Sequence, residues 1–204
     1  MNKKLLTTLC SILTIFSINT YAKETNMNNK KNLVVYFSRS GNQYNRNIKK
    51  GNTAIVADII TNETNADTFE IKLVNDTYPN EYESLTEVAQ KELNENKRPE
   101  IQKFDKNLDD YDTVFIGYPI WWGDMPMPVY TFLENNDLKD KTIAPFCTHG
   151  GSGLSSTDKN IKNTTKAKSV LKGLALYGSK TQTDFDGTKQ NVQNWLKEIG
   201  VSND

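Results

Sequence analysis

Short runs of apolar residues alternate along this chain with longer segments in which apolar residues recur every three or four positions. The first pattern predicts strands, and the second predicts helices that bury one face. The predicted strands cover residues 33–37, 67–73, 113–117, 142–147 and 169–177, the last of them broken near Lys172-Gly173. The predicted helices cover residues 51–61, 81–96, 126–134, 156–163 and 186–199. Strand and helix therefore alternate five times.

This alternation predicts a single α/β domain. Strand–helix–strand units of this kind pair their strands in parallel, with right-handed crossovers and helices on both faces of the sheet. In the second strand, Phe69, Ile71 and Leu73 alternate with polar residues, which is typical of an edge strand with one face in water. We therefore predict a three-layer sandwich around a five-stranded parallel sheet of order 2-1-3-4-5.

The first 22 residues differ from the rest of the chain. Lys3 and Lys4 precede an apolar stretch at residues 5–18, and Thr20-Tyr21-Ala22 places small residues where signal peptidase cleaves. This order predicts a secretory signal peptide at residues 1–22. A membrane anchor is the alternative, but crossing the hydrocarbon core takes about 20 apolar residues, and this stretch is shorter. We expect export to the periplasm or the extracellular space, with membrane contact only through the uncleaved signal peptide.

The exported part is predicted to be a polar tether at residues 23–31 followed by one domain at residues 32–204. The whole chain of 204 residues has a formal net charge of zero, and cleavage leaves 23 basic and 25 acidic residues. A nearly neutral domain lacks the excess positive charge that nucleic-acid binding needs, so we expect no nucleic-acid partner. We expect a monomer or a weak dimer.

Cysteine and histidine are scarce in this sequence. Cleavage leaves Cys147 as the only cysteine, so no intramolecular disulfide can form. His149 is the only histidine, and no cluster of metal-ligating residues surrounds it in the sequence, so we predict no metal site. We expect the hydrophobic core and a bound cofactor to hold the domain together.

Three unusual loops follow the first, third and fourth strands, whose carboxyl ends meet where the strand order reverses. After the first strand, Ser38-Arg39-Ser40-Gly41-Asn42 is separated by eight residues from Gly51-Asn52-Thr53, which opens a helix. Short polar side chains, glycines and a helix N-terminus suit a phosphate monoester without a basic residue. The alternative is an ordinary helix cap. The loop has neither the Walker lysine nor the G-x-G-x-x-G spacing, which disfavours triphosphates and dinucleotides.

The loop after the third strand contains two adjacent tryptophans. Its central residues are Pro119, Ile120, Trp121, Trp122 and Gly123. Paired indole rings in a loop are costly to expose unless they cover something flat and apolar. The alternative is that both rings tuck into the core and anchor the loop. Because Pro and Gly residues on each side stiffen and expose the turn, we favour a planar aromatic ligand.

The loop after the fourth strand holds three glycines within four positions. Its residues are Thr148, His149, Gly150, Gly151, Ser152 and Gly153. The backbone of such a loop can approach a ligand edge closely and donate hydrogen bonds to it. His149 is a candidate proton donor, but we expect it to be solvated or hydrogen-bonded locally. A phosphate end, an aromatic wall and a glycine loop on one edge of the sheet together predict an FMN site.

The same residues resemble the flavodoxin family from Asn32 to about Val201. The likeness is carried by residues 36–42, 117–126 and 146–156. It implies a flavodoxin-like fold that holds one FMN without a covalent bond. It also implies that the FMN phosphate is held by Ser38, Arg39, Ser40, Asn52 and Thr53. The isoalloxazine ring would lie between residues 119–123 and residues 148–151. The chain departs from the family pattern where residues 43–50 split the phosphate loop.

The resemblance also implies a function. Flavodoxins carry single electrons between partner proteins, so we expect an exported electron carrier without a catalytic residue. The alternative is an NAD(P)H-dependent FMN or quinone oxidoreductase of the same fold, with His149 as its proton donor. Against this alternative, the sequence has no second nucleotide-binding motif, and an exported protein meets little NAD(P)H. A flavin-free receiver module would need acidic residues where Ser38-Arg39-Ser40 stands.

Overall fold

The computed structural model describes residues 31–44 and 46–201. The predicted signal peptide and residues 23–30 of the predicted tether lie outside the described residues. Lys31, the last residue of that tether, is the first residue of strand β1 (Lys31–Tyr36). None of the helices in the described part of the chain is long and apolar enough to cross a membrane.

Strands and helices alternate along the chain as the apolar pattern predicts. The main sheet contains β1, β4 (Asp67–Glu70), β5 (Tyr111–Pro119), β6 (Thr142–His149), β7 (Ser169–Val170) and β8 (Leu174–Tyr177). The helices are α1 (Asn52–Thr64), α2 (Tyr82–Asn94), α3 (Met127–Asn135), α4 (Thr157–Thr165), α5 (Gly178–Thr183) and α6 (Phe185–Glu198). A single 3-10 turn, η1 (Leu108–Asp110), precedes β5.

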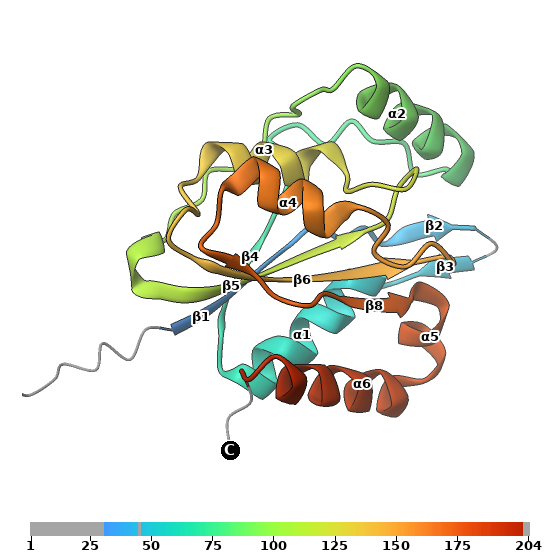
Figure 1. Cartoon of the computed structure of the whole chain (residues 1–204). Helices are drawn as coiled ribbons and strands as arrows, with labels where there is room; N and C mark the ends of the chain where they lie inside the picture. Colours follow the sequence, from blue (N-terminus) through green and yellow to red (C-terminus); the bar gives the residue numbers. More distant parts are fainter. Residues whose placement is uncertain (1–30, 45, 202–204) are drawn as a thin grey trace, which may run out of the picture.

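The strands of the main sheet are all parallel and follow the order β4-β1-β5-β6, with β7 and β8 both paired to β6 (Figure 1). β7 and β8 are two parts of one broken strand, so the predicted order 2-1-3-4-5 is confirmed. Gly173 lies at the predicted break. A side chain at Gly173 would place its Cβ 2.7 Å from a methyl carbon of Leu154, so the close approach of this loop requires glycine.

Helices cover both faces of the sheet and give the molecule three layers (Figure 1). α3 and α4 lie over one face, and α1 and α6 lie over the other. Leu33 and Val35 of β1 join the core on the α3 and α4 side, whereas Val34 between them joins the core against α1 and α6. All three side chains are fully buried, as expected for a parallel strand with both faces covered.

The predicted edge strand is shorter in the structure than in the sequence pattern. The Ile71 N–H still donates to the Tyr36 carbonyl of β1 (2.7 Å), but β4 ends at Glu70 and Leu73 forms an antiparallel bridge with Ile101. The alternation of apolar residues therefore continues from residue 69 to residue 73, although the backbone pairs first with β1 and then with Ile101. Both halves of that segment bury their apolar residues, which explains why one pattern covers them.

Besides the 3-10 turn η1, a hairpin and a short helix are absent from the sequence-based prediction. Residues 41–48 form an antiparallel hairpin of β2 (Gly41–Gln43) and β3 (Arg46–Ile48), and α5 follows β8. The hairpin comprises most of the insertion that splits the first loop. Both elements lie at the carboxyl end of the parallel strands (Figure 1). Ligands bind to parallel α/β sheets at this end, so both elements enlarge the region where a site is expected.

Candidate functional site

A cavity of about 730 Å³ opens at the carboxyl end of the sheet, in the size range of small-molecule and cofactor sites. The loops after β5 and β6 contribute to its lining, as do the first residue of α1, the hairpin, α2 and the start of α5. Eight predicted site residues line it, namely Asn52, Pro119, Ile120, Trp121, Trp122, Thr148, His149 and Gly150. Seven others do not, namely Ser38, Arg39, Ser40, Asn42, Thr53, Gly123 and Gly151.

The adjacent tryptophans take up different positions. The Trp121 ring packs edge-on against Phe37 and Tyr78, with centroids 5.5 and 5.8 Å away, as an anchored loop residue does. The Trp122 side chain is 53% exposed, and its Nε1–H donates to the Thr86 carbonyl of α2 (2.8 Å). Trp121 therefore fits the interpretation in which the ring anchors the loop, and Trp122 fits the interpretation in which an exposed ring can cover a ligand. Only Trp122 offers a largely open ring surface.

A tight turn holds these tryptophans. The N–H and C=O groups of Trp121 and Asp124 hydrogen-bond to each other (2.9 and 3.0 Å), and Trp122 and Gly123 between them both have positive φ (53° and 78°). Two consecutive left-handed residues are typical of a two-residue hairpin turn, where glycine is favoured. A left-handed tryptophan is uncommon, and such backbone strain persists only where surrounding contacts impose it.

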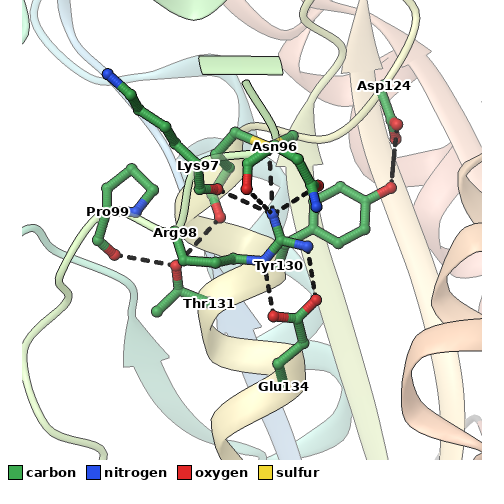
Figure 2. Close-up of polar contacts among 9 residues, drawn as sticks. Asn96, Lys97, Arg98, Pro99, Asp124, Tyr130, Thr131 and Glu134 are labelled. Atoms are coloured by element: carbon green, nitrogen blue, oxygen red, sulfur yellow. Dashed lines mark hydrogen bonds and ion pairs between the residues drawn. The ribbon is translucent and has the colours of Figure 1, made fainter. Parts of the chain in front are cut away.

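The Asp124 side chain supplies contacts that hold this turn in place. Its carboxylate accepts hydrogen bonds from the Tyr130 hydroxyl (3.0 Å) on α3 and from Asn160 Nδ2 (3.1 Å) on α4. The Tyr130 ring lies under the Arg98 guanidinium (5.0 Å), which makes two hydrogen bonds to Glu134 (2.6 and 2.7 Å; Figure 2). Burial and the Asp124 charge raise the pKa of Tyr130, so its hydroxyl remains a donor.

Three of the four predicted phosphate residues that do not line the cavity make contacts that hold neighbouring segments together, and the fourth, Ser40, is exposed. Ser38 Oγ accepts a hydrogen bond from the Ala54 N–H (3.1 Å), so the Ser38 side chain caps the N-terminus of α1. Arg39 forms an ion pair with Asp76 (2.8 Å). The buried hydroxyls of Thr53 and Thr148 share a hydrogen bond (2.8 Å) and join α1 to the end of β6.

The insertion folds back beside the cavity. Gly41 pairs with Ile48 in the hairpin, and Gln43 pairs with Arg46. The left-handed φ of Gly41 (92°) starts the hairpin, which a residue with a side chain would strain. Gln43, Tyr44, Arg46 and Ile48 line the cavity, whereas Asn42 donates to Glu81 Oε1 (3.0 Å) at the start of α2. The split loop is therefore an additional wall of the site.

The glycine loop orients His149. Its Nδ1 accepts a hydrogen bond from the Gly151 N–H (2.9 Å), and its ring lies 4.6 Å from that of Tyr177. Partial burial lowers the pKa of His149, so the imidazole is neutral at pH 7 and carries its proton on Nε2. Beneath this loop, burial raises the pKa of the Cys147 thiol to about 12, which keeps it protonated and unreactive.

Several lining residues were missed by the sequence-based prediction. Besides the hairpin, they are Tyr82, Leu85, Thr86 and Ala89 of α2, Tyr177 of β8, and Gly178, Ser179 and Gln182 of α5. Gln182 Nε2 donates to Asn52 Oδ1 (2.9 Å), which ties the last turn of α5 to the start of α1. The sequence carries little signal for α5, because this six-residue helix is polar and too short for an apolar period.

The charged side chain that lines the cavity is positive. Among the described residues that line the cavity there is no Asp or Glu, and Arg46 is the one Lys or Arg. Such a lining accepts an anion without charge repulsion. In the described part of the chain, no group of three His, Cys, Asp or Glu side chains is placed to hold a metal ion.

Comparisons with known proteins agree with this architecture. A family model described as flavodoxin matches residues 30–199. A protein of Bacteroides eggerthii designated a candidate flavoprotein is 30% identical, with a TM-score of 0.60 over 83% of this chain and 98% of that one. A Lactobacillus acidophilus flavoprotein solved in complex with FMN is 25% identical, with a TM-score of 0.59 over 76% and 97% of the two chains. Oxidised flavodoxin 2 of Bacillus cereus shares the fold at 18% identity (TM-score 0.51, 83% and 97% covered). No curated protein sequence matches the chain.

Proposed function

Because the chain belongs to the flavodoxin family, we propose that it holds one FMN noncovalently in this cavity and carries single electrons between partner proteins outside the cytoplasm. One observation carries the proposal. Six large hydrophobic side chains are exposed in the described part of the chain, and four of them line this cavity, namely Tyr44, Tyr82, Trp122 and Tyr177. Apolar side chains gathered at one exposed place mark a binding site, and aromatic rings favour a flat aromatic ligand.

The residues present fit FMN at both of its ends. Asn52 is the first residue of α1, where the helix dipole and free N–H groups favour a phosphate without a basic side chain. No carboxylate among the described lining residues opposes that negative charge. Trp122 offers its ring to the isoalloxazine, and the backbone of Gly150 is open to solvent where a ring edge would lie. Bound FMN supplies the redox chemistry, and the protein sets its electrostatic surroundings.

The surroundings of the ring favour a low reduction potential. Ile120, Trp121 and Trp122 make this side of the cavity largely apolar. A negative charge placed there loses much of its hydration, which is costly without a compensating partner. The relative solved with FMN supports the assignment of the cofactor.

The state of His149 favours a carrier over an NAD(P)H-dependent oxidoreductase. An oxidoreductase that used His149 as its proton donor would need an imidazole whose pKa lies near the working pH. Burial lowers the pKa of His149, and its Nδ1 is already engaged by the Gly151 N–H. A neutral imidazole held in this way is a weak acid at pH 7.

A spectroscopic and kinetic experiment tests the proposal. The purified protein should be yellow and release one FMN per chain in acid. Dithionite should reduce the bound flavin in two separate one-electron steps, and NADPH should reduce it no faster than it reduces free FMN. A colourless protein that takes up no FMN would contradict the cofactor. Fast NADPH oxidation that is lost in His149→Ala would establish the oxidoreductase instead.

A further inference from the structure

The hairpin and α2 form a side of the cavity that is separate from the loops after β5 and β6, to which the isoalloxazine ring is assigned. We call this the hairpin side and define it by Tyr44, Arg46, Ile48, Tyr82 and Thr86. We propose that the hairpin side binds a small planar aromatic anion, a carboxylate or a sulfonate, next to the flavin. The proposal rests on the proposed function in that FMN occupies the side formed by the loops after β5 and β6.

The wall of the hairpin side is preformed. The Tyr44 ring lies 5.6 Å from the Tyr82 ring of α2, with 56° between the ring planes. Asn42 Nδ2 donates to Glu81 Oε1 (3.0 Å), and Asn47 Nδ2 donates to Asn42 Oδ1 (2.7 Å) across the hairpin. These contacts join the hairpin to the start of α2, so a ligand need not order this wall when it binds.

The aromatic character of the ligand follows from exposure. Tyr44 is 71% exposed and Tyr82 is 37% exposed, although their rings lie side by side. The two tyrosine rings are inclined to each other at 56°, and each presents an aromatic face with a polar hydroxyl tip. Ile48 is buried, also lines the cavity and adds an apolar side chain to this wall. A planar ring that stacks on this wall removes apolar surface from water at little cost in side-chain order.

The negative charge of the ligand follows from Arg46. The sequence has three arginines, and the other two are engaged: Arg39 pairs with Asp76 and Arg98 with Glu134. The Arg46 side chain is exposed, and its guanidinium makes no hydrogen bond or ion pair with residues 31–44 and 46–201. No carboxylate lines the cavity within that part of the chain. A free guanidinium at such a place suits a planar carboxylate or sulfonate, which it can bind through two parallel hydrogen bonds.

Paired probes test this inference on the FMN-loaded protein. 2-Naphthoate is the anionic probe and 2-naphthamide is its neutral counterpart, and binding is measured by calorimetry and by the change in the flavin spectrum. We expect naphthoate to bind more tightly than naphthamide. Arg46→Gln should weaken naphthoate binding about tenfold and leave naphthamide binding unchanged, as the loss of one charge-assisted contact implies. Tyr44→Ala should weaken both. Lys49→Gln, an exposed charge outside the lining, is the matched control and should change neither.

Three outcomes would overturn the inference. Equal naphthoate affinity in wild type and Arg46→Gln would remove the role of Arg46. Naphthoate binding to the apoprotein alone would mean that the probe occupies the place of the flavin. A loss of FMN affinity in Arg46→Gln with riboflavin affinity unchanged would assign Arg46 to the FMN phosphate. Failure of the proposed function is recognised separately, because then the wild-type protein would bind no FMN in the first place.

Discussion

Single residues at the cavity illustrate how one short loop combines anchoring and binding. Trp121 is fixed by edge-on contacts with Phe37 and Tyr78, and the next residue must then turn outward in a left-handed conformation. Such a conformation costs a non-glycine residue on the order of 1 kcal/mol or more. The hydrogen bond from Trp122 Nε1 to the Thr86 carbonyl stabilises this conformation by a free energy of similar size. The strained backbone of Trp122 therefore places the Trp122 ring in an exposed position.

His149 gives a pH-dependent prediction at the same scale. Burial lowers its pKa below 6.5, so below about pH 6.5 the unfolded chain binds a proton that the folded protein does not. The stability of the apoprotein should therefore fall as the pH drops through 6.5 toward the folded pKa, and His149→Gln should remove this part of the pH dependence. Because His149 is the only histidine, NMR titration of its imidazole gives the folded pKa directly. A midpoint at or above 6.5 would contradict the expectation.

At the scale of elements, the turn after β5 depends on the two helices that follow it. Asp124 connects the turn to Tyr130 of α3 and to Asn160 of α4. These helices cover one face of the sheet (Figure 1), and the Asp124–Tyr130 hydrogen bond is drawn in Figure 2. Packing of the turn against α3 and α4 therefore helps to set the position of the exposed Trp122 ring. Asp124 is thus a positioning residue for the cavity wall.

Removing this carboxylate should be costly. Asp124→Ala leaves three partly buried donors without their acceptor, namely the Tyr130 hydroxyl, the Asn160 amide and the Met125 N–H. We expect the free energy of unfolding to fall by about 1–3 kcal/mol in urea denaturation. Asp105→Ala is the control, because Asp105 is exposed and accepts no hydrogen bond in the described part of the chain, and its effect should stay within about 0.5 kcal/mol. Equal stabilities of the two variants would show that Asp124 does not hold the turn.

The elements that could be predicted from sequence are those in which buried positions produce a regular spacing of apolar residues. The central strands at residues 33–37 and 113–117 are continuous apolar runs because helices cover both of their faces. The hairpin of β2 and β3 has no such pattern, since Ile48 is the one buried side chain among its described residues. Its register comes from Gly41 and from contacts with α2, which are distant in sequence. The cavity residues after β5 and β6 were predicted from the tryptophans and glycines of their loops. Those on α5 were missed because this short polar helix has no apolar period, and those on α2 because tertiary contacts bring that predicted helix to the cavity.

For the whole molecule, the sheet begins only eight residues after the proposed cleavage site, because β1 starts at Lys31. We predict that the form recovered outside the cytoplasm has Lys23 as its first residue, which N-terminal sequencing would establish. The form retained in the cytoplasm when export is blocked should keep Met1. A cytoplasmic protein with an intact N-terminus under normal export would refute the proposed location and revive the oxidoreductase.

The position of β1 in the sheet also affects when the protein can fold. β1 lies between β4 and β5, and Leu33 pairs with Val114, which follows it by about 80 residues along the chain. Contacts between residues so far apart slow folding, because the chain must close a long loop before they form. During synthesis β1 emerges first, yet it can gain its second neighbour only after β5 has been made. The chain therefore stays without a complete sheet for more than half of its synthesis, and such an incompletely folded state is what the proposed export would require.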